Sequence, residues 1–151
     1  MASLTAEWLS QQIVEHTPDA VIFADHEGLV RLWNRGAEVM FDFTADEAIG
    51  QNLELIIPER LRQRHNEGYA KTMQTGETRY GGGELLAVPA IRKDGTRISI
   101  EFSIALLKDD AGKVLGAIAV LRDVSARWQK ERELNQRLGE LEAKVKAYPS
   151  S

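Results

Sequence analysis

Residues 17–37 read TPDAVIFADHEGLVRLWNRGA. The stretch contains two short apolar runs, at 20–24 and 29–33, separated by Asp25-His26-Glu27-Gly28, a combination that favours a turn. Asn34 follows the second run, and an asparagine side chain can exchange hydrogen bonds with the backbone where a helix begins. The stretch therefore predicts an antiparallel hairpin that leads directly into a helix.

Helical patterns follow this hairpin. We expect short helices at residues 34–40 and 45–49, the second opened by a capping box at Thr44-Ala45-Asp46-Glu47. A longer helix is predicted over residues 58–74, because a proline suits the first helical turn and Gly76 lies just past the end.

Three further apolar runs come after the helices, at residues 84–92, 96–107 and 114–122. The turn-forming segments 93–95 and 108–112 separate them. With two strands before the helices and three after them, the sequence predicts an α+β domain with a five-stranded antiparallel sheet and helices on one face.

Two amphipathic helices are expected to flank this domain. Residues 1–16 carry apolar side chains at three- to five-residue spacing, and residues 125–151 carry a stripe spaced 4, 3, 4, 3, which is typical of a coiled coil. We divide the chain accordingly, with the central domain at 17–124. Both helices are too short to be stable alone, so we expect a symmetric homodimer that covers them. The expected interface residues are Leu4, Trp8, Ile13, Leu134, Leu138 and Leu141.

Composition excludes several kinds of chemistry. The chain has 151 residues and no cysteine, which removes disulfides, cysteine-bound zinc, iron–sulfur clusters and thiol catalysis. The formal net charge of −4 argues against bulk nucleic-acid binding. We expect a cytoplasmic protein with no membrane partner, since no apolar run is long enough to span a bilayer. No phosphate-binding loop or placed catalytic triad is visible, so we do not expect an enzyme.

Five short motifs occur in an order that resembles the PAS sensor family. They are TPDAV at 17–21, WNRGA at 33–37, DEAIG at 46–50, RKDGT at 92–96 and RDVS at 122–125. The resemblance implies a PAS fold and a sensor or dimerisation module that signals through flanking helices. It also implies that Asp123, Val124 and Ser125 join the sensor to an output helix, the alternative being a plain helix cap. We expect the output to be a further domain or a partner signalling protein contacted through the C-terminal helix.

His65 is the histidine best placed to bind a group inside the domain. Leu61, His65 and Tyr69 are four residues apart and share one face of the predicted 58–74 helix. We expect this face to point into the domain, with Gly68 leaving room beside it. A buried neutral imidazole of this kind can serve as an axial ligand of haem iron.

Residues 57–69 are also similar to the segment that carries the proximal histidine in bacterial oxygen-sensing haem PAS domains, and His65 falls on that position. The resemblance implies haem b bound by His65 as iron ligand. The other residues it implies at the cofactor are Leu61, Tyr69, Leu85, Leu86, Phe102 and Ile104. Residues 83–87 lack the arginine or methionine that those relatives carry, which predicts an aliphatic distal side without oxygen selectivity.

Other occupants of the site remain open. A different apolar ligand, or no ligand at all, is compatible with a histidine on an apolar helix face. Flavin is disfavoured, because the blue-light branch of the family needs an adduct-forming cysteine that this chain lacks. Without any cofactor, the domain would act as a homodimerisation and signal-relay module.

Overall fold

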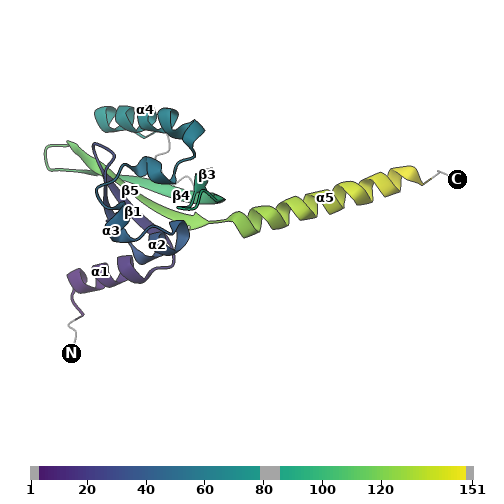
Figure 1. The fold of residues 1–151 in the computed structure, drawn as a ribbon, viewed down its shortest axis with the longest axis horizontal. Helices are drawn as coiled ribbons and strands as arrows, with labels where there is room; N and C mark the ends of the chain where they lie inside the picture. The colour runs from purple at the N-terminus through teal and green to yellow at the C-terminus, as the bar shows by residue number, and fades with distance from the viewer. Residues whose placement is uncertain (1–3, 79–85, 149–151) are drawn as a thin grey trace.

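The computed structural model describes residues 4–78 and 86–148 (Figure 1). In chain order the elements are α1 (Ala6–His16), β1 (Ala20–Asp25), β2 (Val30–Trp33), α2 (Arg35–Phe41), α3 (Ala45–Ala48), the 3₁₀ helix η1 (Leu53–Ile56), α4 (Glu59–Thr75), β3 (Leu86–Ile91), β4 (Arg97–Lys108), β5 (Val114–Asp123) and α5 (Ser125–Ala147).

The five strands form one antiparallel sheet in the order β2-β1-β5-β4-β3. The first strand pairs with the last, with Ala20 opposite Leu121 and Asp25 opposite Gly116, so the N-terminal hairpin joins the C-terminal three-stranded meander. The predicted α+β fold with a five-stranded antiparallel sheet is confirmed.

One face of the sheet carries the core. Alternate residues point to opposite faces of a strand, and the alternating residues Ile98 and Ile100 of β4 are buried. They pack with Phe41 of α2, Ala48 of α3 and Ile56 of η1, which places these three helices on that inner face. The buried cluster consists of Ala20, Ile22, Val30, Trp33, Ala37, Phe41, Ala48, Ile56, Ala90, Ile98, Ile100 and Leu121.

Asn34 is the one buried polar residue among the described parts of the chain, with 2% of its surface exposed. Its Oδ1 accepts hydrogen bonds from the amides of Val21 (2.8 Å) and Ala37 (2.9 Å). Its Nδ2 donates to the carbonyls of Val14 (2.6 Å) and Asp19 (3.0 Å). One side chain therefore connects the end of α1, the start of β1 and the first turn of α2.

Gly36 lets α2 approach the chain just before β1. A Cβ at this position would lie 2.2 Å from the carbonyl oxygen of Asp19 and 3.0 Å from that of Pro18. Because both neighbours are backbone atoms, they cannot move aside as a flexible side chain could. Glycine is required here for close approach, and its backbone conformation is an ordinary helical one.

Most predicted ends agree with the structure to within two residues. Thr5 caps α1, the Thr44–Glu47 capping box opens α3, and Gly76 closes α4 in the left-handed conformation at φ 70°. Pro58 is the N-cap of α4 and not its first helical residue. The turn η1 was not predicted, since four residues show no helical period. The first two residues of the strand predicted at 84–92 lie outside the described residues.

The C-terminal helix projects away from the rest of the molecule (Figure 1). Every residue from 126 to 148 is exposed. None of the described helices combines the length and apolar character that crossing a bilayer would require. The cytoplasmic location stays a prediction.

Replacing Asn34 with alanine removes all four side-chain hydrogen bonds and leaves unpaired the four backbone groups that they satisfied. We expect Asn34→Ala to lower the free energy of unfolding by about 2–4 kcal/mol in urea denaturation. Asn52→Ala is the control, because Asn52 Oδ1 accepts one local hydrogen bond from Glu54 at the start of η1. It should cost about 1 kcal/mol. Equal losses in the two variants would contradict the role assigned to Asn34.

Two helical glycines provide a second matched pair. Gly36→Ala introduces the clash with the Asp19 carbonyl and should destabilise the fold by about 2 kcal/mol or more. In Gly68→Ala the new methyl group meets nothing within 4 Å, so the higher helix propensity of alanine should stabilise the fold by about 0.5–1 kcal/mol. Thermal and urea unfolding should therefore show a lower stability than wild type for Gly36→Ala and a higher one for Gly68→Ala.

Candidate functional site

The inward side of α4 is only partly covered. Leu61, His65 and Tyr69 are half-buried, as predicted for one shared face, and no residue of α4 is fully buried. Gly68 was expected to leave room beside His65, and this expectation is wrong. It is exposed and faces open space, since the helical phase turns position 68 toward solvent.

His65 combines burial with an unused ring nitrogen. Its Nδ1 is the one buried side-chain polar atom without a hydrogen-bond partner among residues 4–78 and 86–148. Burial lowers the pKa of His65 below its ordinary value, opposed by the Asn66 side chain and the Glu54 carboxylate. The imidazole is therefore held neutral, and its enclosed Nδ1 has no hydrogen-bond partner within the described parts of the chain.

Tyr69 lies beside this imidazole but has a partner of its own. The His65 and Tyr69 rings are stacked with centroids 6.1 Å apart. The Tyr69 hydroxyl donates toward the carbonyl oxygens of Ala24 (3.0 Å) and Asp25 (2.6 Å) at the end of β1. Burial, with the Asp25 charge, raises the pKa of Tyr69 to about 12. Tyr69 thus links α4 to β1, and only its ring is left to contact a ligand.

The predicted strand residues share the inner face of the sheet. Leu86 pairs with Phe102 and Ile104 pairs with Ala119, and both Phe102 and Ala119 pack against the core. Leu85 lies outside the described residues. The inward residues Leu86, Phe102 and Ile104 are all apolar, which agrees with an aliphatic and aromatic surface that offers no hydrogen-bond donor.

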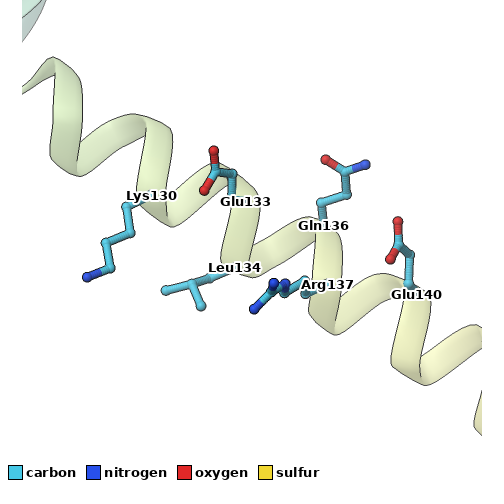
Figure 2. A pocket seen from close by; sticks show the side chains of 6 residues that line it. All are labelled: Lys130, Glu133, Leu134, Gln136, Arg137 and Glu140. Atoms are coloured by element: carbon cyan, nitrogen blue, oxygen red, sulfur yellow. The ribbon is translucent and has the colours of Figure 1, made fainter.

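The predicted cofactor residues on α4 and those on the strands come from different parts of the domain. Helix α4 packs chiefly against β5 and η1, and Tyr69 links it to β1, whereas Leu86, Phe102 and Ile104 lie on β3 and β4. One shallow hollow lies along the exposed surface of α5 (Figure 2) and another on the outer face of the sheet near Val120, and His65 lines neither of them. The assignment of these residues to a cofactor stays a prediction.

Haem places two chemical requirements on the residues that bind it. It requires a neutral imidazole with a free nitrogen and apolar surroundings for the porphyrin. His65 has the unpartnered nitrogen and the lowered pKa, and the inward residues of β3 and β4 are apolar. The chemistry of these residues therefore fits haem, although the α4 residues and the strand residues lie on separate parts of the domain.

The junction before α5 is built on β4. The Val124 amide donates to the Ser99 carbonyl (2.9 Å), and the Ser99 amide donates to Ser125 Oγ (2.9 Å). Asp123 Oδ1 accepts from the Ser125 amide (2.9 Å), so its carboxylate holds the turn into the helix. The predicted triplet thus lies where β5 passes into α5.

Sequence reasoning missed an ion pair at this junction. Arg127, in the first turns of α5, pairs with Glu101 on β4. Beside it, Arg122 pairs with Asp19 (3.1 Å), and this pairing raises the pKa of Arg122. These partners are 26 and 103 residues apart, so no local pattern could have indicated them.

The residues expected at a dimer interface are all exposed in the single chain. Trp8 and Ile13 on α1, and Leu134, Leu138 and Leu141 on α5, have between 36% and 66% of their surface exposed. Leu4 precedes α1 and is exposed as well. Each of these apolar side chains therefore leaves at least 36% of its surface exposed in the single chain.

A family model described as the PAS fold matches residues 9–124. The chain is 29% identical over 138 residues to the Sensor protein FixL of Bradyrhizobium diazoefficiens, a match covering 91% of this chain and 26% of that protein. It is 28% identical over 107 residues to the Oxygen sensor protein DosP of Escherichia coli, covering 71% of this chain and 13% of the relative. The chain thus spans about a quarter or less of these relatives.

Solved structures show the same fold. A PAS domain from Colwellia psychrerythraea superposes with a TM-score of 0.69 at 18% identity, covering 81% of this chain and 99% of that one. An RNA-binding Light-Oxygen-Voltage receptor superposes with a TM-score of 0.68 at 19% identity, covering 98% of this chain and 42% of the receptor chain. At these identities the likeness concerns the fold alone.

The Tyr69 hydroxyl should make stability pH-dependent at high pH. Its pKa of about 12 in the folded state lies above the ordinary 10.0, so its contribution is complete below pH 10 and is lost as the pH rises toward 12. Tyr69→Phe should be less stable than wild type at neutral pH, and this difference should shrink between pH 10 and 12. Urea unfolding of both proteins across this range measures it. Parallel stability curves would contradict the assignment.

Proposed function

The chain belongs to the PAS family, and from this premise we propose that it is a sensory signal-transduction module that binds haem b through His65. The observation that carries the proposal is the neutral, half-buried His65 with a buried Nδ1 that has no partner. A buried polar atom without a hydrogen bond costs free energy, and a bound group that shifts or ligates the imidazole would offset this cost.

The chain's own residues would contribute in distinct ways. His65 would ligate the iron, with Leu61 and the Tyr69 ring beside it on α4. Leu86, Phe102 and Ile104, with Leu85, would supply the apolar surface on the sheet side. Bound haem supplies an iron that can take up a diatomic gas. The inward residues described on β3 and β4 offer no side-chain hydrogen-bond donor, so we propose gas binding without selectivity for oxygen.

The proposal for signal output rests on the junction between β5 and α5. Residues 123–125 hydrogen-bond α5 to β4, the strand that carries Phe102 and Ile104 on its inner face. A change at the inner face can therefore reach α5 through one strand. We assign no catalytic step to this chain. Among its relatives are a sensor protein and a signal transduction histidine-protein kinase, which supports an output domain or partner protein contacted through α5.

A second candidate function is a cofactor-free homodimer that relays a signal. The exposed apolar side chains on α1 and α5 support it, since a second copy would remove them from water. The two proposals are compatible, because the candidate haem residues and the candidate interface residues do not overlap.

The haem proposal is tested by the absorption spectrum of the full chain produced with haem supplied. We expect a Soret band for the wild type and its loss in His65→Ala. His26→Ala is the control, because His26 is exposed in the β1–β2 turn and should leave the band unchanged. Far-UV circular dichroism checks that all three proteins are folded. A folded but colourless wild type would end the haem proposal and leave the relay module. A band that survives in His65→Ala would overturn the assignment of His65 as the iron ligand.

A further inference from the structure

Four charged side chains of alternating sign form a row across the sheet at the junction before α5. Asp19 directly precedes β1, Arg122 lies on β5, Glu101 on β4 and Arg127 on α5. Strands β1 and β4 are the two neighbours of β5 in the sheet, so an acidic residue stands on each side of Arg122. We call these four residues the charged row.

The charged row is divided into two ion pairs. Arg122 is turned toward Asp19 and makes a two-pronged contact, with Nε 3.2 Å from Oδ1 and Nη2 3.1 Å from Oδ2. Glu101 pairs with Arg127. In this arrangement the carboxylate of Glu101 is available to α5, because the arginine next to it on the sheet is held by another partner.

Arg122 is nevertheless placed to compete for Glu101. The two residues are directly opposite each other on β5 and β4, so their side chains share one face of the sheet. That face is the outer one, because the neighbours Ile100 and Phe102 of Glu101 pack in the core. Asp19, Glu101 and Arg122 border the same hollow there. Both carboxylates raise the pKa of Arg122, Asp19 more than Glu101. Arg122 can thus reach either acidic partner.

Few other contacts set the direction of α5. The helix projects away from the domain, and every residue from 126 to 148 is exposed, so burial does not seat it (Figure 1). The hydrogen bonds to Ser99 involve only Val124 and Ser125 at its start. Beyond Ser125, the pair of Arg127 with Glu101 is the one side-chain ion pair that joins α5 to the sheet among the described residues. Loss of this pair would let α5 turn about residues 124–125.

The other end of the charged row is tied to α1. Asp19 follows Thr17, the C-cap of α1, by two residues. Its carbonyl accepts a hydrogen bond from Asn34 Nδ2 (3.0 Å), and the same nitrogen donates to the carbonyl of Val14 in α1 (2.6 Å). A displacement of α1 therefore acts directly on Asp19.

We propose that the charged row is a partner-exchange switch that couples α1 to α5. While Asp19 holds Arg122, Glu101 holds Arg127 and α5 keeps one direction. When a movement of α1 withdraws Asp19, Arg122 turns to Glu101, Arg127 loses its partner and α5 is released. The inference adds a control at the junction through which the proposed function sends its output. It requires neither bound haem nor a second copy of the chain.

The distance between two spin labels measures the direction of α5 in the full chain. Because the chain has no cysteine, Ala111→Cys in the β4–β5 turn and Gln136→Cys on α5 provide the two thiols for labelling. Both positions are exposed. Dilution with unlabelled protein restricts the measured distances to labels within one copy. With the charged row intact, we expect a narrow distance distribution at low salt.

Removal of the Asp19 charge tests the coupling at a site that does not touch α5. Asp19→Asn should lose the narrow distribution, because Arg122 then turns to Glu101. Asp46→Asn makes the same charge change at an exposed position of α3 and should keep the narrow distribution.

A rescue distinguishes partner exchange from the simple loss of a surface ion pair. Combining Asp19→Asn with Arg122→Gln removes the competitor and should recover the narrow distribution. Combining Asp19→Asn with Arg132→Gln, which removes an arginine further along α5, should not recover it. Arg122→Gln alone should keep the narrow distribution, whereas Arg127→Gln should lose it.

Salt tests the charged row without any substitution in it. The side chains of Arg122 and Arg127 are 70% and 53% exposed, so dissolved ions screen their pairs. At an ionic strength of about 1 M the screening length falls to about 3 Å, and the narrow distribution should be lost. The distribution of Arg127→Gln should not respond, because its pair is already absent.

The outcomes separate this inference from the haem proposal. A narrow distribution in Asp19→Asn, or a broad one in the double variant with Arg122→Gln, overturns the switch. So does a distribution with the row intact that is broad at low salt or does not respond to high salt. Far-UV circular dichroism checks that each variant is folded, and the salt series decides the question if Asp19→Asn is not. A wild type without a Soret band overturns haem binding and leaves the switch standing.

Discussion

The structure depends most on the four hydrogen bonds made by the buried side chain of Asn34. They join three pieces of chain that would otherwise leave buried backbone groups unpaired, at the end of α1, the start of β1 and the first turn of α2. Burying an amide is favourable only when its donors and acceptors are matched, so this site admits few other side chains. Gly36 completes it, because the helix beginning at Arg35 must pass against the Asp19 carbonyl.

The two faces of the sheet make different contacts. The inner face of the sheet carries the core and, further along β4, the apolar residues Phe102 and Ile104. The outer face of the same strand carries Glu101, which pairs with Arg127 on α5. Ser99 lies on β4 as well and hydrogen-bonds the start of α5. One strand thus connects the candidate ligand site to the helix that leaves the domain, as a module that passes a signal outward requires.

The candidate site was predictable in part. A four-residue spacing places Leu61, His65 and Tyr69 on one helix face, and all three are half-buried. Their partners were not predictable. The Tyr69 hydroxyl bonds to carbonyls 44 and 45 residues earlier in the chain. Gly68 faces solvent, because the packing of α4 against the domain decides which of its residues turn inward. The unpaired His65 Nδ1 likewise depends on the neighbours that burial brings to it.

The sequence by itself determined the local elements: apolar runs between glycine turns specify strands, caps and periodicity specify helices, and the heptad spacing specifies the stripe on α5. These follow from interactions within a few residues, so they can be read in order along the chain. Only the tertiary structure decided that β1 pairs with β5, that Asn34 joins three elements and that Arg127 meets Glu101. Those contacts link residues far apart in sequence, and their geometry exists only once the chain has closed on itself.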